Sequence, residues 1–278
     1  MTVGPPLVSI IVLCHNYGRF LREAVDSALG QTYPNCEVLV LDDGSTDDSL
    51  EVAHSYGDAI RVFTHPNMGV ERTSNRGVEE SRGEYTAFLS ADDVFEPTYV
   101  EELYAALTAV PEASYAYCRS QMFGADDRVL RAFPFSAYLI ALRTNYVNAC
   151  ALTRRADYLA VGGMRDVGEM TMEDWDLWLR MIEHRKRGTF VRKPLLRWRR
   201  HEAGSRNLTD SRVQAAVAAM HERHRELRWA LRGPRARVRY LFDLGVAAAD
   251  IPLGFSRWPR LVRLLERSSW RSFERQYR

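Results

Sequence analysis

Cysteine is scarce in this 278-residue chain, and no two cysteines form a Cys-x-x-Cys pair. The wide scatter of the cysteines argues against a zinc site or a disulfide framework, and a reducing compartment is expected. No run reaches the roughly 18 consecutive apolar residues that a membrane-spanning helix requires. The first residues, 1–3, also lack the basic start of a secretion signal, so we expect a cytoplasmic protein. The four cysteines are Cys14, Cys36, Cys118 and Cys150.

A glycine-rich phosphate loop is also absent. No Gly-x-Gly-x-x-Gly follows the first predicted strand, residues 7–13, where dinucleotide-binding proteins carry it. Residues 14–18 read Cys-His-Asn-Tyr-Gly instead. This absence disfavours a nicotinamide-dependent enzyme. It also counts against a nucleotidyltransferase, which combines an α/β sheet with acidic metal ligands but normally carries a glycine-rich loop near the first strand. Both remain minor alternatives.

Charge is distributed unevenly along the chain, although the formal net charge is only +2. Residues 223–278 hold 14 Arg against 5 Asp or Glu, so this segment is near +9 and the remainder near −7. The spacing predicts a basic helical face that is a candidate for peripheral contact with an anionic membrane. A solvated basic face on a helix packed against the protein is equally consistent with it. Nucleic acid is not an expected partner, because no base-reading motif accompanies the charge. The arginines that recur every three or four residues are Arg257, Arg260, Arg263, Arg267, Arg271, Arg275 and Arg278.

Apolar runs alternate with helical spacings through the first 117 residues, which predicts a parallel α/β sheet. Hydrophobic residues make up 46% of the chain, enough for a sizeable core. We expect an α/β catalytic domain at 1–206 and a basic helical extension at 207–278. Strands are predicted at 7–13, 38–41, 60–63, 85–89, 113–117 and 148–152, with another beginning at 190–191. Helices are predicted at 20–29, 70–81, 99–108 and 173–187 and through most of 207–278, with breaks at 233–234 and 254–259. Residues 119–146 are less regular and are interpreted as a candidate lining of an acceptor cleft.

Acidic residues follow two of the predicted strands and begin one of the helices. Asp42-Asp43 and Asp92-Asp93 come directly after strands, and Glu173-Asp174-Trp175-Asp176 opens the later helix. The carboxyl ends of parallel strands meet at one edge of a sheet, where α/β proteins bind ligands. The sequence therefore predicts a metal–nucleotide pocket at that edge, with the third cluster as a source of a catalytic base.

Each acidic cluster also has a structural explanation. Residues 42–47, Asp-Asp-Gly-Ser-Thr-Asp, can form a polar turn and a helix cap. Residues 91–93 can begin a turn toward Pro97. Acidic residues such as Glu173 and Asp174 are also common in the first turn of any helix, where they oppose its dipole. The motifs that surround the three clusters favour the functional interpretation.

These motifs resemble, in order, those of family 2 glycosyltransferases with the GT-A fold, over roughly residues 7–205. The resemblance implies a Rossmann-like, mostly parallel sheet flanked by helices. It also implies an inverting transfer of a sugar from a nucleoside-diphosphate sugar to the hydroxyl of a saccharide, a lipid-linked or a small-molecule acceptor. The motifs are residues 8–16, 31–34, 40–47, Asn67-Met68-Gly69, Asn75-Arg76-Gly77, Gly83-Glu84-Tyr85, Ala91-Asp92-Asp93, Val161-Gly162-Gly163 and Glu173-Asp174.

The donor pocket is expected at the first two strand ends. A carboxylate there can accept a hydrogen bond from a nucleobase imide N–H, which leaves the phosphates free for a metal. We assign this role to Asp43, with Asp42 nearby. The resemblance places Leu13 and His15 in the same pocket. Arg72 is a weaker candidate for a phosphate contact.

Asp92-Asp93 resembles the family's Asp-x-Asp site, whose carboxylates hold Mg²⁺ or Mn²⁺ against a diphosphate; hard oxygen ligands suit both ions. Ser90 occupies the position where many relatives have the first acid, so Asp93 is the expected direct ligand, with Asp92 beside the donor. His201 lies in a segment similar to one in which a histidine approaches the metal or pyrophosphate. The alternative for His201 is an ordinary surface residue in a basic loop.

Asp174 matches the family's acceptor-side acid, which removes the proton from the attacking hydroxyl. Its place in the first turn of a helix keeps the carboxylate ionised, whereas burial beside Trp175 would raise its pKa toward a working value. Ser90 and Ser74 depart from the family pattern. A degenerate relative that binds nucleotide or glycan without turnover therefore remains an alternative.

Overall fold

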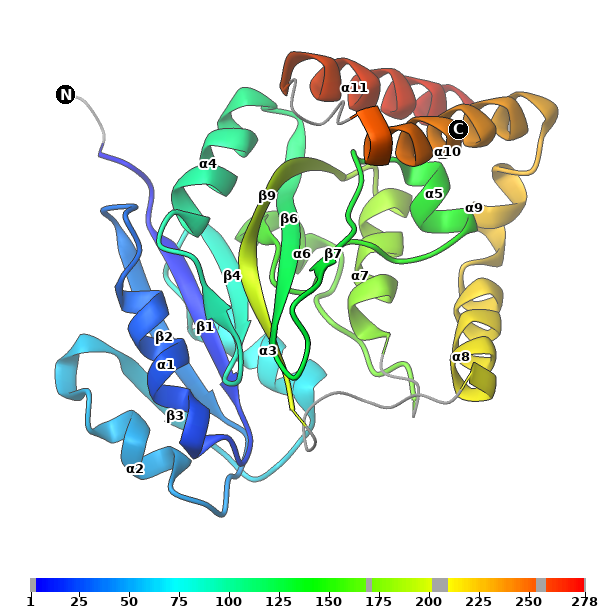
Figure 1. The fold of residues 1–278 in the computed structure, drawn as a ribbon. Coiled ribbons are helices and arrows are strands. Elements are labelled where there is room, and N and C mark those ends of the chain that lie inside the picture. Colours follow the sequence, from blue (N-terminus) through cyan, green and yellow to red (C-terminus); the bar gives the residue numbers. More distant parts are fainter. Residues whose placement is uncertain (1–3, 169–171, 202–209, 254–258, 278) are drawn as a thin grey trace.

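The computed structural model describes residues 4–168, 172–201, 210–253 and 259–277 (Figure 1). These residues form one nine-stranded sheet in the order β3-β2-β1-β4-β8-β6-β9-β5, with β7 paired to β6. The strands are β1 (Val8–Cys14), β2 (Cys36–Asp42), β3 (Arg61–Thr64), β4 (Tyr85–Ser90), β5 (Val94–Phe95), β6 (Ala113–Gly124), β7 (Val129–Leu130), β8 (Leu152–Arg154) and β9 (Arg187–Arg200). The helices are α1 (Gly18–Leu29), α2 (Ser49–His54), the short η1 (Gly57–Ala59), α3 (Val70–Glu80), α4 (Tyr99–Ala109), α5 (Ala137–Leu142), α6 (Arg155–Ala160), α7 (Glu173–Glu183), α8 (Asp210–Arg223), α9 (Arg225–Ala230), α10 (Pro234–Leu253) and α11 (Pro259–Gln276).

The longer strand pairings are parallel, as the alternating pattern predicts. β1 lies between β2 and β4 and runs parallel to both. Its register sets Cys14 opposite Asp42 and Leu13 opposite Ser90. The residues that follow β1, β2 and β4 therefore emerge at one edge of the sheet. The predicted α/β fold with a mostly parallel, helix-flanked sheet is confirmed.

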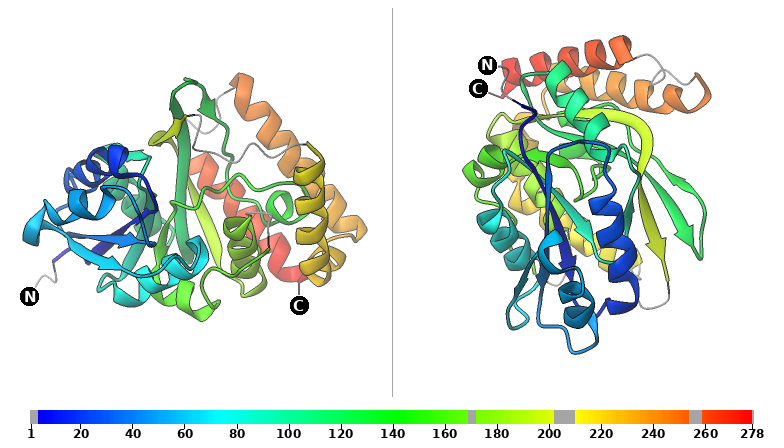
Figure 2. Two further views of the ribbon diagram at one scale, coloured as in Figure 1. Left: turned by 90° about the horizontal axis from the view of Figure 1, so that it is seen from below. Right: turned by 90° about the vertical axis from the view of Figure 1, so that its left-hand side faces the viewer.

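Helices cover both faces of the sheet, so its central strands are buried on both sides (Figure 2). Consecutive side chains of a strand point to opposite faces. Accordingly, Ile11 packs in one core with α3 and α7, whereas Ile10 and Val12 pack in a second core with α1 and α4. This two-sided burial explains why the strand sequences are continuous apolar runs rather than alternating ones.

The C-terminal helices pack toward the end of the sheet that lies away from β1, β2 and β3 (Figure 2). Trp270 and Phe273 of α11 belong to the same core as Tyr115 of β6. Glu266 of α11 is fully buried and accepts hydrogen bonds from the main-chain N–H groups of Phe135 and Phe190, both at 3.0 Å. Among the described helices, none has the length and apolar content to cross a bilayer. The predicted domain boundary at 206/207 and the break at 254–258 lie outside the described residues.

Predicted elements up to residue 109 are confirmed to within two residues, but four later predictions are wrong in detail. Residues 119–146 are more regular than expected, because 119–124 continue β6 alongside β9 and residues 137–142 form α5. The strand predicted at 148–152 begins only at Leu152, where β8 makes short antiparallel pairings with β4 and β6. The helix predicted at 173–187 ends at Glu183, because Arg185 adopts a left-handed φ of 57°. The strand expected to begin at 190–191 begins at 187, as β9.

Candidate active site

The acids after β2 are buried and hold the loops around them. Asp42 accepts a hydrogen bond from the Thr64 hydroxyl at 2.9 Å. The two carboxylate oxygens of Asp43 accept from the main-chain N–H groups of Met68, at 2.8 Å, and Gly69, at 3.1 Å. Between strand and loop, Gly44 has a φ of 70°, and a Cβ there would sit 2.6 Å from the Asn67 nitrogen. Glycine is therefore required at this turn.

Leu13 and His15 lie beside Asp43, as the sequence predicts. The carbonyl oxygen of Leu13 accepts from the N–H of Ala91, at 2.9 Å, and so joins the ends of β1 and β4. His15 Nδ1 lies 2.8 Å from the carbonyl oxygen of Asp43, which makes Nδ1 the protonated nitrogen. The amide of Asn67 lies 3.3 Å from the same ring. These residues lie close together because β1 and β2 end at the same edge of the sheet.

Arg72 lies apart from this network. It is exposed on the first turn of α3, just after the loop that Asp43 holds. Its side chain makes no hydrogen bond or ion pair with any residue that the structure describes. The exposed guanidinium can contact an anionic ligand near the strand edge, but none of the described residues fixes its position.

Asp92 and His201 come together although 109 residues separate them. His201 Nε2 lies 3.1 Å from Asp92 Oδ2, and Ser90 donates its hydroxyl to Asp92 Oδ1 at 2.5 Å. The imidazole packs against the rings of Tyr17 and Phe20, with centroids 5.7 and 4.9 Å away. His201 is therefore only slightly exposed and is held at the acidic edge. Ser90, which replaces an acid of the family pattern, supports the carboxylate that remains.

Asp93 is bound by the main chain of β9. Its Oδ1 accepts the main-chain N–H of Arg199 at 2.9 Å, and Arg199 Nε donates to the Asp92 carbonyl oxygen at 2.8 Å. Burial and the neighbouring Asp92 charge together raise the pKa of Asp93 well above its ordinary value. A cation would relieve the cost of holding two carboxylates so close together in a buried place.

A divalent ion shared with a ligand fits this pair of acids better than a protein-only metal site. Among the residues with described positions, no three His, Cys, Asp or Glu side chains form a group able to hold a metal. Mg²⁺ is usually held by one or two carboxylates together with substrate phosphates. Asp92 and Asp93 match that requirement, and His201 lies next to them.

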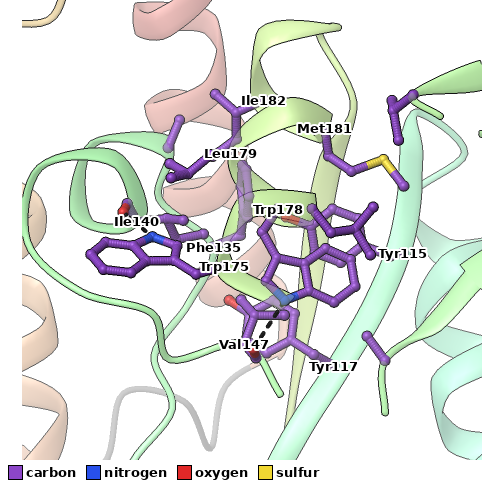
Figure 3. Close-up of a cluster of buried hydrophobic side chains, with 14 of the residues drawn as sticks. Tyr115, Tyr117, Phe135, Ile140, Val147, Trp175, Trp178, Leu179, Met181 and Ile182 are labelled. Atoms are coloured by element: carbon purple, nitrogen blue, oxygen red, sulfur yellow. Dashed lines mark hydrogen bonds between the residues drawn. The ribbon is translucent and has the colours of Figure 1, made fainter. Parts of the chain in front are cut away.

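Asp174 lies in the first turn of α7. Two tryptophans of this helix fix the position of the helix against the 140–147 segment (Figure 3). Trp175 Nε1 donates to the Ile140 carbonyl oxygen at 2.9 Å, and Trp178 Nε1 donates to the Val147 carbonyl oxygen at 3.0 Å. These two bonds hold both ends of the 140–147 segment against the helix. From that segment, Asn145 Nδ2 donates to Asp174 Oδ2 at 3.0 Å. The carboxylate therefore has a fixed orientation.

Cys150 lies between the 140–147 segment and β8 and is almost fully buried. Burial raises the pKa of its thiol well above the ordinary value, and the negative charges of Asp93, Cys118 and Asp174 add to this effect. The thiol is therefore neutral. The hydroxyl of Tyr99 donates to the Cys150 carbonyl oxygen, which anchors this position to α4.

Sequence reasoning did not identify Asn145 or Cys150 as site residues. Asn145 lies in the segment that lacked a regular pattern, and Cys150 was considered only for disulfides and zinc. The one available signal for Asn145 was a polar side chain next to a predicted acceptor cleft.

The parallel sheet, the buried acids at its strand edge and the separate carboxylate on α7 together define a glycosyltransferase of the GT-A type. Comparison with known proteins agrees. The model of the glycosyl transferase family 2 matches residues 9–158, which is more than half of the chain. The protein belongs to this family.

Curated relatives carry the same description. A glycosyltransferase of Rickettsia typhi, named as uncharacterized, is 31% identical over 212 residues, which cover 73% of this chain and 66% of the relative. A glycosyltransferase of Rickettsia felis is 33% identical over 195 residues, 64% of this chain. The match spans only 31% of that relative's length.

Two solved structures share the fold. TarS of Staphylococcus aureus, residues 1–349 in complex with UDP-GlcNAc, has a TM-score of 0.59 and 15% identity, and the match covers 97% of this chain and 91% of that one. The mannosyltransferase PcManGT of Pyrobaculum calidifontis, in complex with GDP-Man and Mn²⁺, has a TM-score of 0.58 and 15% identity. That match covers 97% of this chain and 85% of the other. The likeness extends over the C-terminal helices as well as the family domain.

Proposed function

We propose that the protein transfers a sugar from a nucleoside-diphosphate sugar to an acceptor hydroxyl, with inversion at the anomeric carbon. The observation that carries this proposal is the convergence of Asp92, Asp93 and His201 at the edge where the parallel strands end, with Asp174 on the separate helix α7. Inversion by a single displacement needs a leaving-group site and a base on opposite sides of the reacting carbon. UDP-GlcNAc and GDP-Man in the structural relatives support this class of donor.

The nucleoside of the donor would lie over the ends of β1 and β2. Each oxygen of the Asp43 carboxylate has one main-chain partner, and a carboxylate oxygen has a second lone pair for an imide N–H. Leu13 would contribute an apolar wall, and Asp42 would keep the turn in place. His15 is fixed by the bond from Nδ1 to the Asp43 carbonyl oxygen and by the Asn16 amide, which lies 3.2 Å from Nε2, so its ring would form a rigid wall of the pocket. Arg72 would contact a phosphate from the side.

The diphosphate would lie at Asp92, Asp93 and His201, where a Mg²⁺ or Mn²⁺ ion fits. When bound, such an ion offsets the charge that develops on the departing diphosphate. The chain itself contributes Arg199, whose guanidinium nitrogen donates to the Asp92 carbonyl oxygen and so lies at the same edge. The two buried acids position the leaving group away from Asp174.

Asp174 would act as the base. An acceptor hydroxyl between α7 and the 140–147 segment would give its proton to a carboxylate oxygen of Asp174 while its own oxygen attacks the anomeric carbon. The bond from that carbon to the diphosphate oxygen breaks, and its electron pair leaves with the diphosphate. Asn145 would hold the carboxylate in the orientation that this transfer needs.

Release of nucleoside diphosphate tests this function. The protein would be incubated with UDP- and GDP-sugars and Mn²⁺, with and without candidate saccharide acceptors, and free UDP or GDP would be measured. We expect turnover with one donor class and an increase with a correct acceptor. Tight donor binding without any hydrolysis or transfer would instead favour the non-catalytic alternative. The residues Ser90 and Ser74, which depart from the family pattern, are the reason for considering that alternative.

The basic face of α11 supports a further proposal about where the acceptor resides. The helix buries Val262, Trp270 and Phe273, and most of its arginines are exposed to solvent. We propose that this face contacts an anionic membrane, which would favour a lipid-linked acceptor. Binding to phosphatidylglycerol vesicles should weaken as salt is raised. A protein that stays in the supernatant at low and high salt would contradict membrane contact. The exposed members of the face are Arg260, Arg267, Arg271 and Arg275, whereas Arg257 and Arg278 lie outside the described residues.

A further inference from the structure

A cavity of about 700 Å³ opens between α4, β9 and the first turns of α11. This volume lies within the roughly 300–1,000 Å³ range of small-molecule sites. Most of its wall is apolar, and the small alanines of α4 leave its depth unfilled. The walls include Ala105, Ala106, Ala109, Phe190, Val191 and Val262.

A β-bulge turns two cationic residues toward this cavity. Val191 of β9 pairs with Cys118, but the next pairing joins Pro194 to Arg119. Arg192 and Lys193 thus have no partner residue on β6, and both line the cavity. Bulges of this kind re-aim side chains and often lie beside binding sites.

The charges around the cavity do not cancel. Lys193 forms an ion pair with Glu102, the acidic residue on the cavity wall. Arg192 and Arg263 are half-buried and have no acidic partner within the described parts of the chain, and Arg192 Nε is buried without any hydrogen bond. Removing a guanidinium from water without a partner is unfavourable, so an anion at this place would be stabilised.

We propose that the cavity binds an anionic amphiphile, a lipid phosphate with an alkyl or isoprenoid chain. The chain would lie against the alanines of α4 and against Phe190 and Val262, and the phosphate would meet Arg192 and Arg263. The apolar wall and the two guanidinium groups, for which the described residues offer no acidic partner, match the two parts of such a molecule. Neither a free sugar nor a nucleotide would fill the apolar depth.

This site is separate from the proposed transfer site. Arg192 and Arg199 belong to the same strand, and seven residues at about 3.3 Å each put them roughly 23 Å apart. The cavity can therefore hold its ligand while the strand edge binds a donor. Binding of the amphiphile does not depend on the proposed glycosyl transfer and can be measured without any sugar nucleotide.

Calorimetry with dodecyl phosphate below its micelle concentration tests the proposal. We expect one molecule per chain. Inorganic phosphate, which has no chain, and dodecyl maltoside, which has no charge, should each bind at least tenfold more weakly. Decyl phosphate should bind about 15-fold more weakly than dodecyl phosphate, since each buried methylene contributes roughly fourfold.

Two arginine substitutions, a control and a cavity-filling substitution assign the binding to this cavity. Arg192→Ala and Arg263→Ala should each weaken dodecyl phosphate roughly tenfold or more, as loss of charged hydrogen bonds does. Arg82→Ala, at an exposed arginine outside the cavity, should change nothing. Ala106→Phe should fill the cavity and abolish the dependence on chain length. Ala109→Leu serves the same purpose if thermal unfolding shows that the phenylalanine disturbs the fold.

Several results would overturn the proposal. These are no binding of dodecyl phosphate by the wild-type protein, equal affinity for decyl and dodecyl phosphate, or full affinity in both arginine variants. Inorganic phosphate binding as tightly as dodecyl phosphate would show a simple anion site. Undiminished binding by a folded cavity-filling variant would place the amphiphile on another surface.

Discussion

Two acids of the donor side, Asp43 and Asp93, differ from the acids of α7 in the groups that reach them from distant segments. For Asp43 and Asp93 these groups are main-chain N–H groups, of Met68 and Gly69 and of Arg199. For Asp174 the distant partner is a side chain. Asn145 Nδ2 donates to its Oδ2, and the neighbouring main-chain N–H of Trp175 donates to its Oδ1 at 2.7 Å.

Asp176, two residues after Asp174, shows the same dependence on side chains. It accepts from Arg180 Nε at 2.7 Å and lies 3.1 Å from His224 Nε2. Main-chain donors remain when a side chain is replaced. Replacing a partner residue should therefore leave the bonds to Asp43 and Asp93 in place, whereas at Asp174 and Asp176 it removes the bond.

The sharpest contrast is expected at Asp174. Asp174→Asn keeps the size of the side chain but removes the proton acceptor, so turnover should fall on the order of 10² to 10⁴. Donor affinity should change little, because the donor-side contacts are untouched. Nucleotide release and donor calorimetry on the same preparation measure both. Near-normal turnover would remove Asp174 from the role of base.

Glu266 tests whether α11 is part of the same folding unit. Besides the two main-chain N–H groups, its carboxylate accepts from the Thr189 hydroxyl at 3.0 Å and lies 3.5 Å from an Arg187 guanidinium nitrogen. Glu266→Ala would leave that buried guanidinium without its buried partner, and such losses cost about 3–5 kcal/mol. Denaturant unfolding should show this loss in a single transition. A loss confined to a separate transition would indicate an independent extension.

The same residue predicts a pH dependence. Burial raises the pKa of Glu266 to about 7, despite the nearby Arg187. The folded state then holds a proton that the unfolded state, with a pKa near 4.5, releases. Its contribution to stability should therefore decrease as pH rises from about 4.5 through 7 and stay constant above that. Glu266→Gln removes the titrating group. The difference in unfolding free energy between the wild-type protein and this variant should therefore vary with pH from about 4.5 to 7 and be constant above 7.

A smaller effect is expected at Asp93. Asp93→Ala should weaken nucleoside-diphosphate binding roughly 10- to 100-fold in Mn²⁺, and far less in chelator, because without metal there is no bridge to lose. The variant loses the bond from the Arg199 N–H, but Arg199 Nε still donates to the Asp92 carbonyl oxygen and keeps β9 at this edge. Equal losses in both buffers, measured by calorimetry, would assign Asp93 another role.

The smallest effect is expected at Asn145, which we interpret as a positioning residue. Asn145→Ala should lower kcat about tenfold and leave the KM for the donor unchanged. The acid limb of the pH–rate profile should move to higher pH, because the ionised Asp174 loses a hydrogen-bond donor. Asn148→Ala is the matched control, since its amide donates to the Cys118 carbonyl oxygen instead. Similar profiles for the two variants would show that Asn145 has only a structural role.

The sequence was most informative where local pattern decides structure. The strands before Asp42 and Asp92 are apolar runs buried on both faces, so both their position and their shared edge could be predicted. The start of α7 at Glu173 was also evident from helical spacing. The expectation that Leu13 and His15 share a pocket with Asp43 came from the family resemblance, and the structure places His15 Nδ1 2.8 Å from the Asp43 carbonyl oxygen.

The rest depended on contacts between distant segments. The end of α7 is set by a left-handed residue, Arg185, which no pattern announces. The bond between Asn145 and Asp174 depends on how the 140–147 segment packs against α7. The bulge at Arg192 appears only once β9 is paired with β6. Tertiary packing, rather than propensity, fixes these features.

The central claim is that the strand edge binds a nucleoside diphosphate together with a divalent metal. Thermal unfolding with UDP, GDP, dTDP and ADP, each with Mn²⁺ or with chelator, tests it directly. At about 100 times its dissociation constant, a ligand stabilises the folded state by about 2.7 kcal/mol, or roughly 5–10 °C in a chain of this size. We predict a shift of that order for one of these nucleotides in Mn²⁺ and little or none in chelator. No shift with any nucleotide, or an equal shift without metal, would contradict the claim.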